Sequence, residues 1–159
     1  MTLLGVDIVA VDHTQQAMAR RLHAVQMSAY AQEARLLGAV WFPPLERSVE
    51  DIADGHERFT AAFVGDELAG AIGIEPDPEG LGLTIASLVV APPFQRRGIA
   101  RALMAQLLAE HGHGVLTVQT GAKNAPALAL YATCGFGELR RWSVGREPLE
   151  LVKLLRPVP

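Results

Sequence analysis

The sequence is poor in several features that mark particular protein classes. It has a single cysteine, Cys134, which excludes an intrachain disulfide, and only 6% of its residues are aromatic. No uninterrupted apolar run approaches the roughly 18 residues of a transmembrane helix. The first segment lacks a basic start and reaches Asp7 and Asp12 too early for a signal peptide. We therefore expect a cytoplasmic protein with no membrane partner.

Neither sign of charge dominates the composition. Fourteen Lys and Arg residues stand against 17 Asp and Glu residues, a net charge of -3, so we expect no nucleic-acid partner. Hydrophobic residues make up 50% of the chain and charged residues 19%, which is typical of a folded core rather than of disorder. No linker-like segment or repeat interrupts the sequence, so we expect one domain over residues 1–159.

Hydrophobic periodicity predicts the order of the secondary-structure elements. Strands are expected at residues 4–11, 59–64, 68–75, 83–91, 115–120, 136–144 and 149–155. Helices are expected at residues 13–29 (continuing or restarting as far as Leu37), 48–54, 97–110 and 125–133. Asp12 and Gln15 resemble a capping box for the first helix. The order predicts an α/β fold with a mixed central sheet of about six to seven strands and about four flanking helices.

The most informative segment is QRRGIAR, residues 95–101, where an apolar strand gives way to a helix. The first N–H groups of a helix lack intrahelical acceptors and carry the positive end of its dipole. Gly98 lets a ligand approach the backbone closely, and three arginines add positive charge. This combination predicts a pyrophosphate site; the alternative is an ordinary helix start with solvated arginines. The Walker and dinucleotide-binding glycine motifs do not occur in the sequence.

The same segment carries a resemblance to a known family. Gln95 to Ala100 matches the Q/R-x-x-G-x-G/A signature of the GNAT N-acetyltransferase superfamily. Farther along, NAPA, LY and GF (residues 124–127, 130–131 and 135–136) resemble that family's N-x-x-A…L-Y…G-F pattern. The two motifs occur in the family's order, and the predicted elements are similar to the GNAT fold along essentially the whole chain. The resemblance implies that the fourth and fifth strands splay apart to form a cofactor slot.

The resemblance also implies acetyl-CoA as the cosubstrate. Its pyrophosphate would lie on the backbone N–H groups of the loop before the helix, and its pantetheine arm would pair with the exposed edge of the fourth strand. A β-bulge would open the slot, and the N–H of Val89 or Val90 would stabilise the oxyanion. The implied cofactor-binding residues are Leu88, Val89, Val90, Gln95, Arg96, Arg97, Gly98, Ile99, Ala100, Arg101 and Asn124.

Two residues of the second motif have alternative roles. Asn124 would contact the cofactor, cap the following helix, or do both. Tyr131 matches the family's general acid, which protonates the departing thiolate; the alternative is a tyrosine packed between helix and sheet. Some family members carry a glutamate base on the fourth strand, but Thr84 stands near that place here. The proton would then pass to Glu75 or to water.

The resemblance implies an N-acetyltransferase that moves an acetyl group to a primary amine by direct attack in a ternary complex. The acceptor would be a small-molecule amine or a peptide. The alternatives are a non-catalytic acyl-CoA sensor, which the threonine in place of glutamate favours, and a nucleotide-binding protein of another class. Tyr30, Trp41 and Phe42 would line the acceptor pocket or belong to the core.

Three further expectations concern metals, covalent chemistry and assembly. His111 and His113 have no third ligand candidate nearby in sequence, so we expect no metal. Cys134 has no His or Asp nearby and is not expected to be a nucleophile. The last two strands offer an apolar edge with Leu149, Leu151 and Val152, from which we predict a homodimer.

Overall fold

A single seven-stranded sheet organises the computed structural model, which describes residues 3–147 and 149–159. The sheet order is β1-β2-β3-β4-β5-β7-β6. The strands are β1 (Asp7–Val11), β2 (Arg58–Val64), β3 (Glu67–Pro76), β4 (Leu83–Val90), β5 (Leu116–Gly121), β6 (Gly137–Val144) and β7 (Leu149–Arg156). The helices are α1 (Gln16–Leu37), α2 (Val49–Ala53), α3 (Ile99–His111) and α4 (Ala125–Thr133), with short 3-10 turns η1 (Pro43–Glu46) and η2 (Pro92–Phe94). The predicted α/β architecture is confirmed.

The ends of the helices follow local chemistry, with one correction. The first helix is continuous as far as Leu37, where left-handed Gly38 (φ 63°) ends it. The predicted capping box at Asp12 is wrong, because the Asp12 side chain accepts hydrogen bonds from the N–H (3.0 Å) and hydroxyl (2.6 Å) of Thr14. Asp12 therefore closes a turn before the helix begins. No helix in the described part of the chain is long and apolar enough to cross a membrane.

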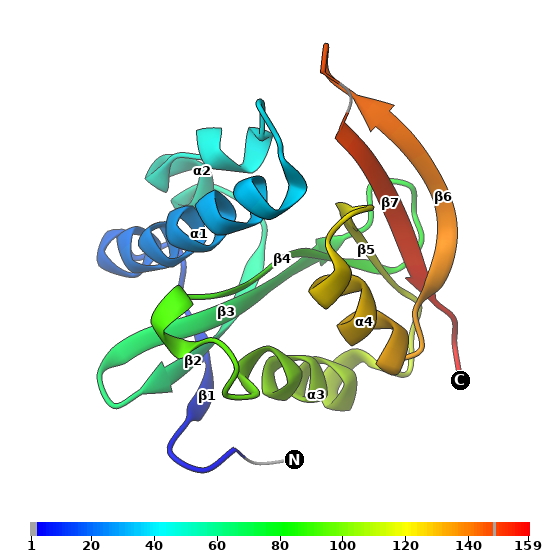
Figure 1. The fold of residues 1–159 in the computed structure, drawn as a ribbon. Helices are drawn as coiled ribbons and strands as arrows, with labels where there is room; N and C mark the ends of the chain where they lie inside the picture. The colour runs from blue at the N-terminus through cyan, green and yellow to red at the C-terminus, as the bar shows by residue number, and fades with distance from the viewer. Residues whose placement is uncertain (1–2, 148) are drawn as a thin grey trace.

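Two apolar clusters lie on opposite faces of the sheet. One cluster joins α1 and α2 to β2, β3 and β4. The other joins α3 and α4 to β3, β4, β5 and β7. In Figure 1 the sheet accordingly runs between α1 and α2 above and α3 and α4 below. Burial of both faces explains why the apolar residues of β4 run almost without interruption.

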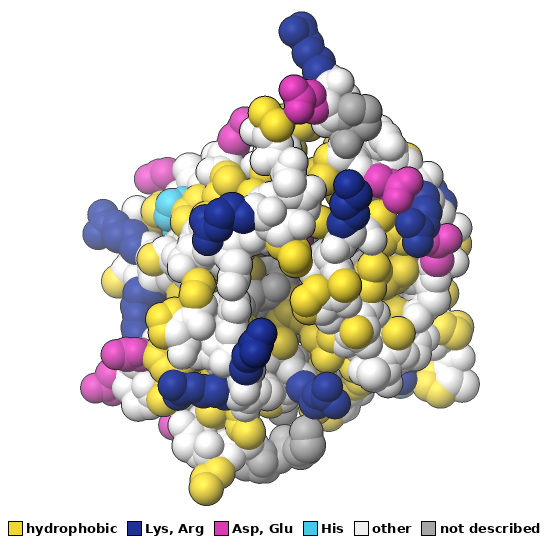
Figure 2. Space-filling model, in the orientation of Figure 1, with side chains coloured by type: hydrophobic (Ala, Val, Ile, Leu, Met, Phe, Trp, Pro, Cys, Tyr) yellow, Lys and Arg dark blue, Asp and Glu magenta, His cyan; other side chains and the backbone are white. Residues whose placement is uncertain are grey.

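The centre of the sheet opens into a V. The parallel strands β4 and β5 pair only at Leu83–Leu116, Thr84–Thr117 and Ile85–Val118. The register between β3 and β4 then shifts and leaves Ala86 without a partner, which is the β-bulge that the resemblance implied. Beyond it the two strands part, and Figure 2 shows a hollow on this face between α1 and α4.

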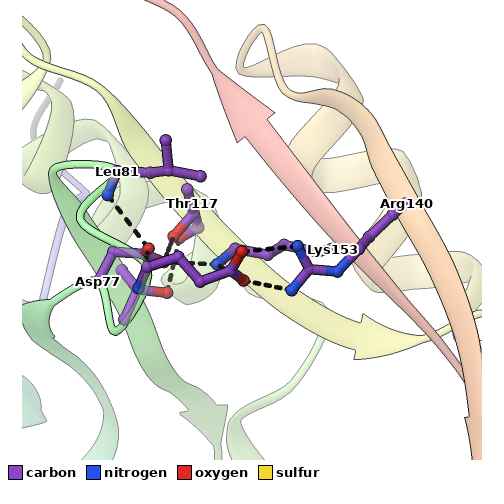
Figure 3. A network of polar contacts seen from close by, with 7 residues as sticks. Asp77, Leu81, Thr117, Arg140 and Lys153 are labelled. Carbon is purple, nitrogen blue, oxygen red and sulfur yellow. Dashed lines mark hydrogen bonds and ion pairs between the residues drawn. The ribbon is translucent and has the colours of Figure 1, made fainter.

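The closed end of the V holds an ionic cluster, in which buried Asp77, Thr117 and Lys153 meet the exposed ion pair of Arg140 and Glu79 (Figure 3). Asp77 accepts hydrogen bonds from the Lys153 ammonium (2.7 Å) and the Thr117 hydroxyl (2.8 Å). Lys153 is only 1% exposed and also donates to Glu79 (2.8 Å), which pairs with Arg140. The cluster thus ties the β3–β4 turn to β5, β6 and β7.

The last two strands differ from the expected apolar edge. β7 lies inside the sheet between β5 and β6, so Leu151 and Val152 face neighbours rather than an open edge. The edge strand at this end of the sheet is β6, and its Glu138 and Arg141 are exposed and form an ion pair. Charged edges oppose association through added strands. The homodimer stays a prediction, without the apolar edge on which it rested.

Candidate functional site

A cavity of about 690 Å³ lies where β4 and β5 part. Nine of the predicted cofactor residues line it: Leu88, Val90, Gln95, Arg96, Gly98, Ile99, Ala100, Arg101 and Asn124. Lys and Arg side chains gather at the rim of the hollow in Figure 2, over the start of α3. Two predicted residues are not part of the lining. The Val89 side chain packs into the core beneath α1, and the Arg97 guanidinium lies over the Phe94 ring, 5.3 Å from its centre.

The start of α3 leaves backbone donors available. The N-cap residue Gly98 has a left-handed backbone (φ 81°) and supplies no side-chain cap. Arg96, two residues earlier, is also left-handed (φ 62°), a conformation that L-residues adopt at a cost. The N–H groups of the first helical turn therefore lack a side-chain acceptor, beside two arginines that line the cavity. This arrangement is suited to a phosphate.

The Gln95 side chain fixes this loop to its surroundings. Its amide donates to the backbone carbonyl of Val90 (3.0 Å) and to the side-chain oxygen of Gln32 on α1 (2.5 Å). The loop, the end of β4 and α1 are therefore held together at one wall of the cavity.

Along β4, backbone N–H groups point alternately toward β3 and toward the gap between β4 and β5. The N–H of Ala91 donates to Ala69 on β3 (2.8 Å). Because the direction alternates along an antiparallel strand, Val89 also turns its N–H toward β3, whereas Leu88 and Val90 turn theirs toward the gap. Of the two residues expected to stabilise an oxyanion, only Val90 has the required direction.

A second cavity of about 310 Å³ adjoins the first. Five residues line both cavities: Glu33, Leu88, Asn124, Ala127 and Tyr131. Tyr131 is 5% exposed, and its ring packs 5.6 Å from the ring of Phe136. Burial, and then the nearby Glu33 carboxylate, raise the pKa of the Tyr131 hydroxyl. The hydroxyl therefore stays protonated at neutral pH, as a proton donor must.

Asn124 links the helix that carries Tyr131 to α1. Its side-chain oxygen accepts the N–H of Ala127 (3.3 Å), which confirms the predicted cap of α4. Its amide donates to Glu33 (3.1 Å) and to the Thr120 hydroxyl (3.4 Å). Both ends of the side chain thus have protein partners, and the cofactor contact of Asn124 stays a prediction.

Glu33 is a residue that the motifs did not identify. Burial raises the pKa of its carboxyl, against the opposing hydrogen bond from Asn124. The helical spacing of the sequence could have identified it, because Glu33 lies on the same face of α1 as Gln26, Tyr30 and Leu37. Polar residues on an otherwise apolar face indicate polar partners across the interface.

The buried carboxylate of Glu57 supports the bulge in β4. It is 2% exposed, accepts a hydrogen bond from the Ser87 hydroxyl, and forms an ion pair with Arg47 (2.7 Å). A Cβ at Gly73 would lie 1.8 Å from the Glu57 carboxylate, so the glycine makes room for this contact. Ser87 directly follows the bulged Ala86, and the cluster therefore fixes β4 where it leaves β5.

Of the remaining candidate residues, some line the second cavity and others lie away from it. Tyr30 and Phe42 line the second cavity and also pack in the apolar cluster beneath α1, whereas Trp41 is 48% exposed and lies outside the cavity. Thr84 is buried and donates to the Thr117 carbonyl (3.3 Å). Glu75 lines a third, more open cavity rather than the two that meet at Tyr131. Within the part of the chain that the structure describes, no three His, Cys, Asp or Glu side chains are grouped to hold a metal.

Together, a splayed parallel strand pair, helix N–H groups without a side-chain cap and a protonated tyrosine define an α/β domain with a site suited to a phosphate-bearing ligand. The model of the acetyltransferase (GNAT) family matches residues 18–136. The chain belongs to this family.

The chain is also similar to individual proteins in sequence and in fold. The chain is 37% identical over 128 residues to the UPF0157 protein YqkA of Bacillus subtilis, covering 79% of this chain and 36% of that protein. It spans about a third of the length of the first curated relatives that it matches. The fold resembles the ribosomal-protein-S18-alanine N-acetyltransferase from Escherichia coli (TM-score 0.74, 20% identity, 96% and 94% of the two chains). It also resembles yncA from Salmonella typhimurium with its cofactor acetyl-CoA (TM-score 0.73, 14% identity, 97% and 94%).

Proposed function

We propose that this protein transfers the acetyl group of acetyl-CoA to a primary amine. The observation that carries the proposal is that two cavities meet at Tyr131. The larger cavity has room and backbone donors for CoA, and the smaller one gives a second molecule access to the same hydroxyl. The yncA structure with acetyl-CoA supports the identity of the cosubstrate.

The cofactor is assigned to the larger cavity. Its pyrophosphate lies on the N–H groups that follow Gly98, beside Arg96 and Arg101. Its pantetheine arm runs along the open edge of β4, where Leu88 and Val90 present their N–H groups. This direction brings the thioester to Tyr131 at the junction of the two cavities.

The reaction balances as a direct transfer. The neutral amine nitrogen attacks the thioester carbonyl carbon, and the resulting oxyanion faces the N–H of Val90. The carbon–sulfur bond then breaks and the sulfur takes the proton of the Tyr131 hydroxyl. The proton that leaves the acylated nitrogen restores that hydroxyl, and the ammonium form of the acceptor has already released one proton to become the neutral amine. The products are an N-acetylated acceptor, free CoA and the proton that the acceptor's ammonium releases.

The acceptor enters from the smaller cavity and is a small-molecule amine or a peptide amino group. A fold neighbour is named for acetylating the alanine of ribosomal protein S18, which makes peptide N-termini a suitable member of an acceptor panel. The non-catalytic alternative, an acyl-CoA sensor, predicts the same cofactor binding without transfer.

The test combines binding with turnover. Calorimetry with CoA, ATP and NAD should give binding for CoA alone, and acetyl-CoA with a panel of amines should release free thiol in step with acetylated amine. Binding of CoA without thiol release from any amine would favour the sensor. Binding of ATP or NAD in preference to CoA would overturn both.

A further inference from the structure

The smaller cavity has an unusual balance of side chains. Its lining is mostly apolar, with Phe42, Ile85, Val118, Leu149 and Leu151 among its residues. Within the described chain, no Lys, Arg or His lines it, and Glu33 is its one carboxylate. A negatively charged acceptor would therefore enter without a cation to neutralise it, and burying an unpaired charge is costly.

Glu33 also occupies a defined position. It lines both cavities, as Tyr131 does, and the hydrogen bond from Asn124 (3.1 Å) holds its carboxylate in place. The other titratable side chains that line the two cavities are Tyr30, Tyr131, Arg96 and Arg101. Of these groups, only a carboxylate is free to accept a proton at neutral pH.

The other carboxylates nearby are poorly placed. Glu57 is buried and engaged by Arg47 (2.7 Å) and by Ser87. Glu75 lines the third cavity and shares no lining with Tyr131. The burial that raises the pKa of Glu33 also makes its carboxylate a stronger base than an exposed one.

Resting on the proposed function, we infer that Glu33 receives the acceptor's ammonium and takes its proton, and that the acceptor carries an apolar substituent and no carboxylate beside the amine. One proton passes from the ammonium to the Glu33 carboxylate and frees the nitrogen lone pair. After C–N bond formation and C–S cleavage, Tyr131 has given its proton to sulfur, and a proton from the acylated nitrogen restores it. The Glu33 carboxyl returns its proton to solvent.

The substitution Glu33→Gln removes the negative charge and the basic carboxylate but can keep the hydrogen bond with Asn124. A glutamine oxygen can still accept from Asn124, so a merely structural role predicts a fully active variant. A role in proton removal predicts that kcat/KM falls by about a hundredfold, while the affinity for acetyl-CoA is unchanged. Glu67→Gln, the same change at an exposed site at the start of β3, is the matched control and should behave as the parent. Retained activity in Glu33→Gln overturns the inference.

The pH dependence of kcat/KM separates proton removal from a packing role, because a change in packing would lower activity equally at every pH. In Glu33→Gln the deficit should shrink as pH rises toward the pKa of the amine, because free amine then needs no base. A deficit that stays constant with pH contradicts proton removal by Glu33. Glu33→Asp keeps a carboxylate and should retain more activity than Glu33→Gln, provided that both variants bind acetyl-CoA as the parent does; the opposite order also contradicts it.

Two probe amines test the acceptor class. 2-Phenylethylamine and phenylalanine share a ring and a primary amine and differ by one carboxylate. The inference predicts that kcat/KM is at least tenfold higher for 2-phenylethylamine, and equal values or a preference for phenylalanine overturn it. Turnover of other amines but of neither probe also overturns the class, while the proposed function stands. Absence of turnover with any amine, despite CoA binding, removes the proposed function itself.

Discussion

The two ends of the V between β4 and β5 are built from opposite chemistry. At the closed end the strands pair, and the buried charges of Asp77 and Lys153 neutralise each other at 2.7 Å. At the open end the strands part, the walls are largely apolar, and Glu33 and Tyr131 stand at the junction of two cavities. Paired charges hold the frame at the closed end, whereas at the open end we propose that Glu33 and Tyr131 exchange protons with a ligand. Burial alone therefore does not distinguish a structural charge from a group available to a ligand, whereas the partners of the buried group do.

The largest expected effect comes from breaking the closed end. Lys153→Met leaves the Asp77 carboxylate buried without its cation, and such a loss costs about 3–5 kcal/mol of unfolding free energy. Chemical denaturation of parent and variant measures it. Arg141→Gln, which removes two exposed ion pairs, is the control and should change the unfolding free energy far less, because solvent screens exposed pairs. Equal effects of the two substitutions would contradict the distinction between buried and exposed pairs.

Tyr131→Phe removes the hydroxyl at the open end of the V and keeps the packing of the ring. The ring still contacts Phe136, but the proton donor is lost, so turnover should fall about a hundredfold. The affinity for acetyl-CoA should stay close to that of the parent, because other groups hold the cofactor. Steady-state kinetics and calorimetry separate the two effects. Loss of affinity without loss of turnover would make Tyr131 a cofactor contact instead.

Lowering the pH should reduce the unfolding free energy through protonation of Asp77 at the closed end. Burial opposes ionisation of Asp77, but hydrogen bonds from Lys153 and Thr117 prevail and lower its pKa to about 2 from 3.8. A lowered pKa stabilises the fold above the ordinary value, and that stability is lost as pH falls from about 4 to about 2. Denaturation at several pH values should show this slope. The double variant Asp77→Asn/Lys153→Met should show a flatter one, and an identical slope would exclude Asp77 as its source.

Filling the cofactor cavity should have the smallest effect. Ala100 lines that cavity in the first turn of α3, so Ala100→Leu should weaken CoA binding about tenfold, or about 1.4 kcal/mol. Leucine is a good helix former, and the unfolding free energy should change little. Ala109→Leu, on the exposed part of the same helix, is the control. Unchanged CoA affinity in Ala100→Leu would locate the cofactor elsewhere.

Features set by neighbouring residues could be predicted from the sequence. The start of α3 at Gly98, the cap at Asn124 and the end of α1 at Gly38 each depend on residues within a few positions. Asp12 shows the limit of this approach, because its side chain has competing local partners and closes a turn instead of capping the helix.

Features that depend on distant partners could not be predicted in the same way. Glu33 and Asn124 are 91 residues apart, and Glu57 and Ser87 are 30 apart. No local pattern connects either pair, so the motifs identified Tyr131 and the loop before α3 but not the carboxylates around them. The apolar β7 was likewise expected at an edge, because pairing with both β5 and β6 is not visible in its sequence.

The most direct test of the account is a structure of the protein with bound acetyl-CoA. We predict that the pyrophosphate lies at the start of α3, that pantetheine runs along the edge of β4, and that the thioester sulfur lies within about 4 Å of the Tyr131 hydroxyl. The smaller cavity should remain accessible to an amine. A thioester far from Tyr131, or a cofactor outside the gap between β4 and β5, would contradict the claim that acetyl transfer takes place where the two cavities meet.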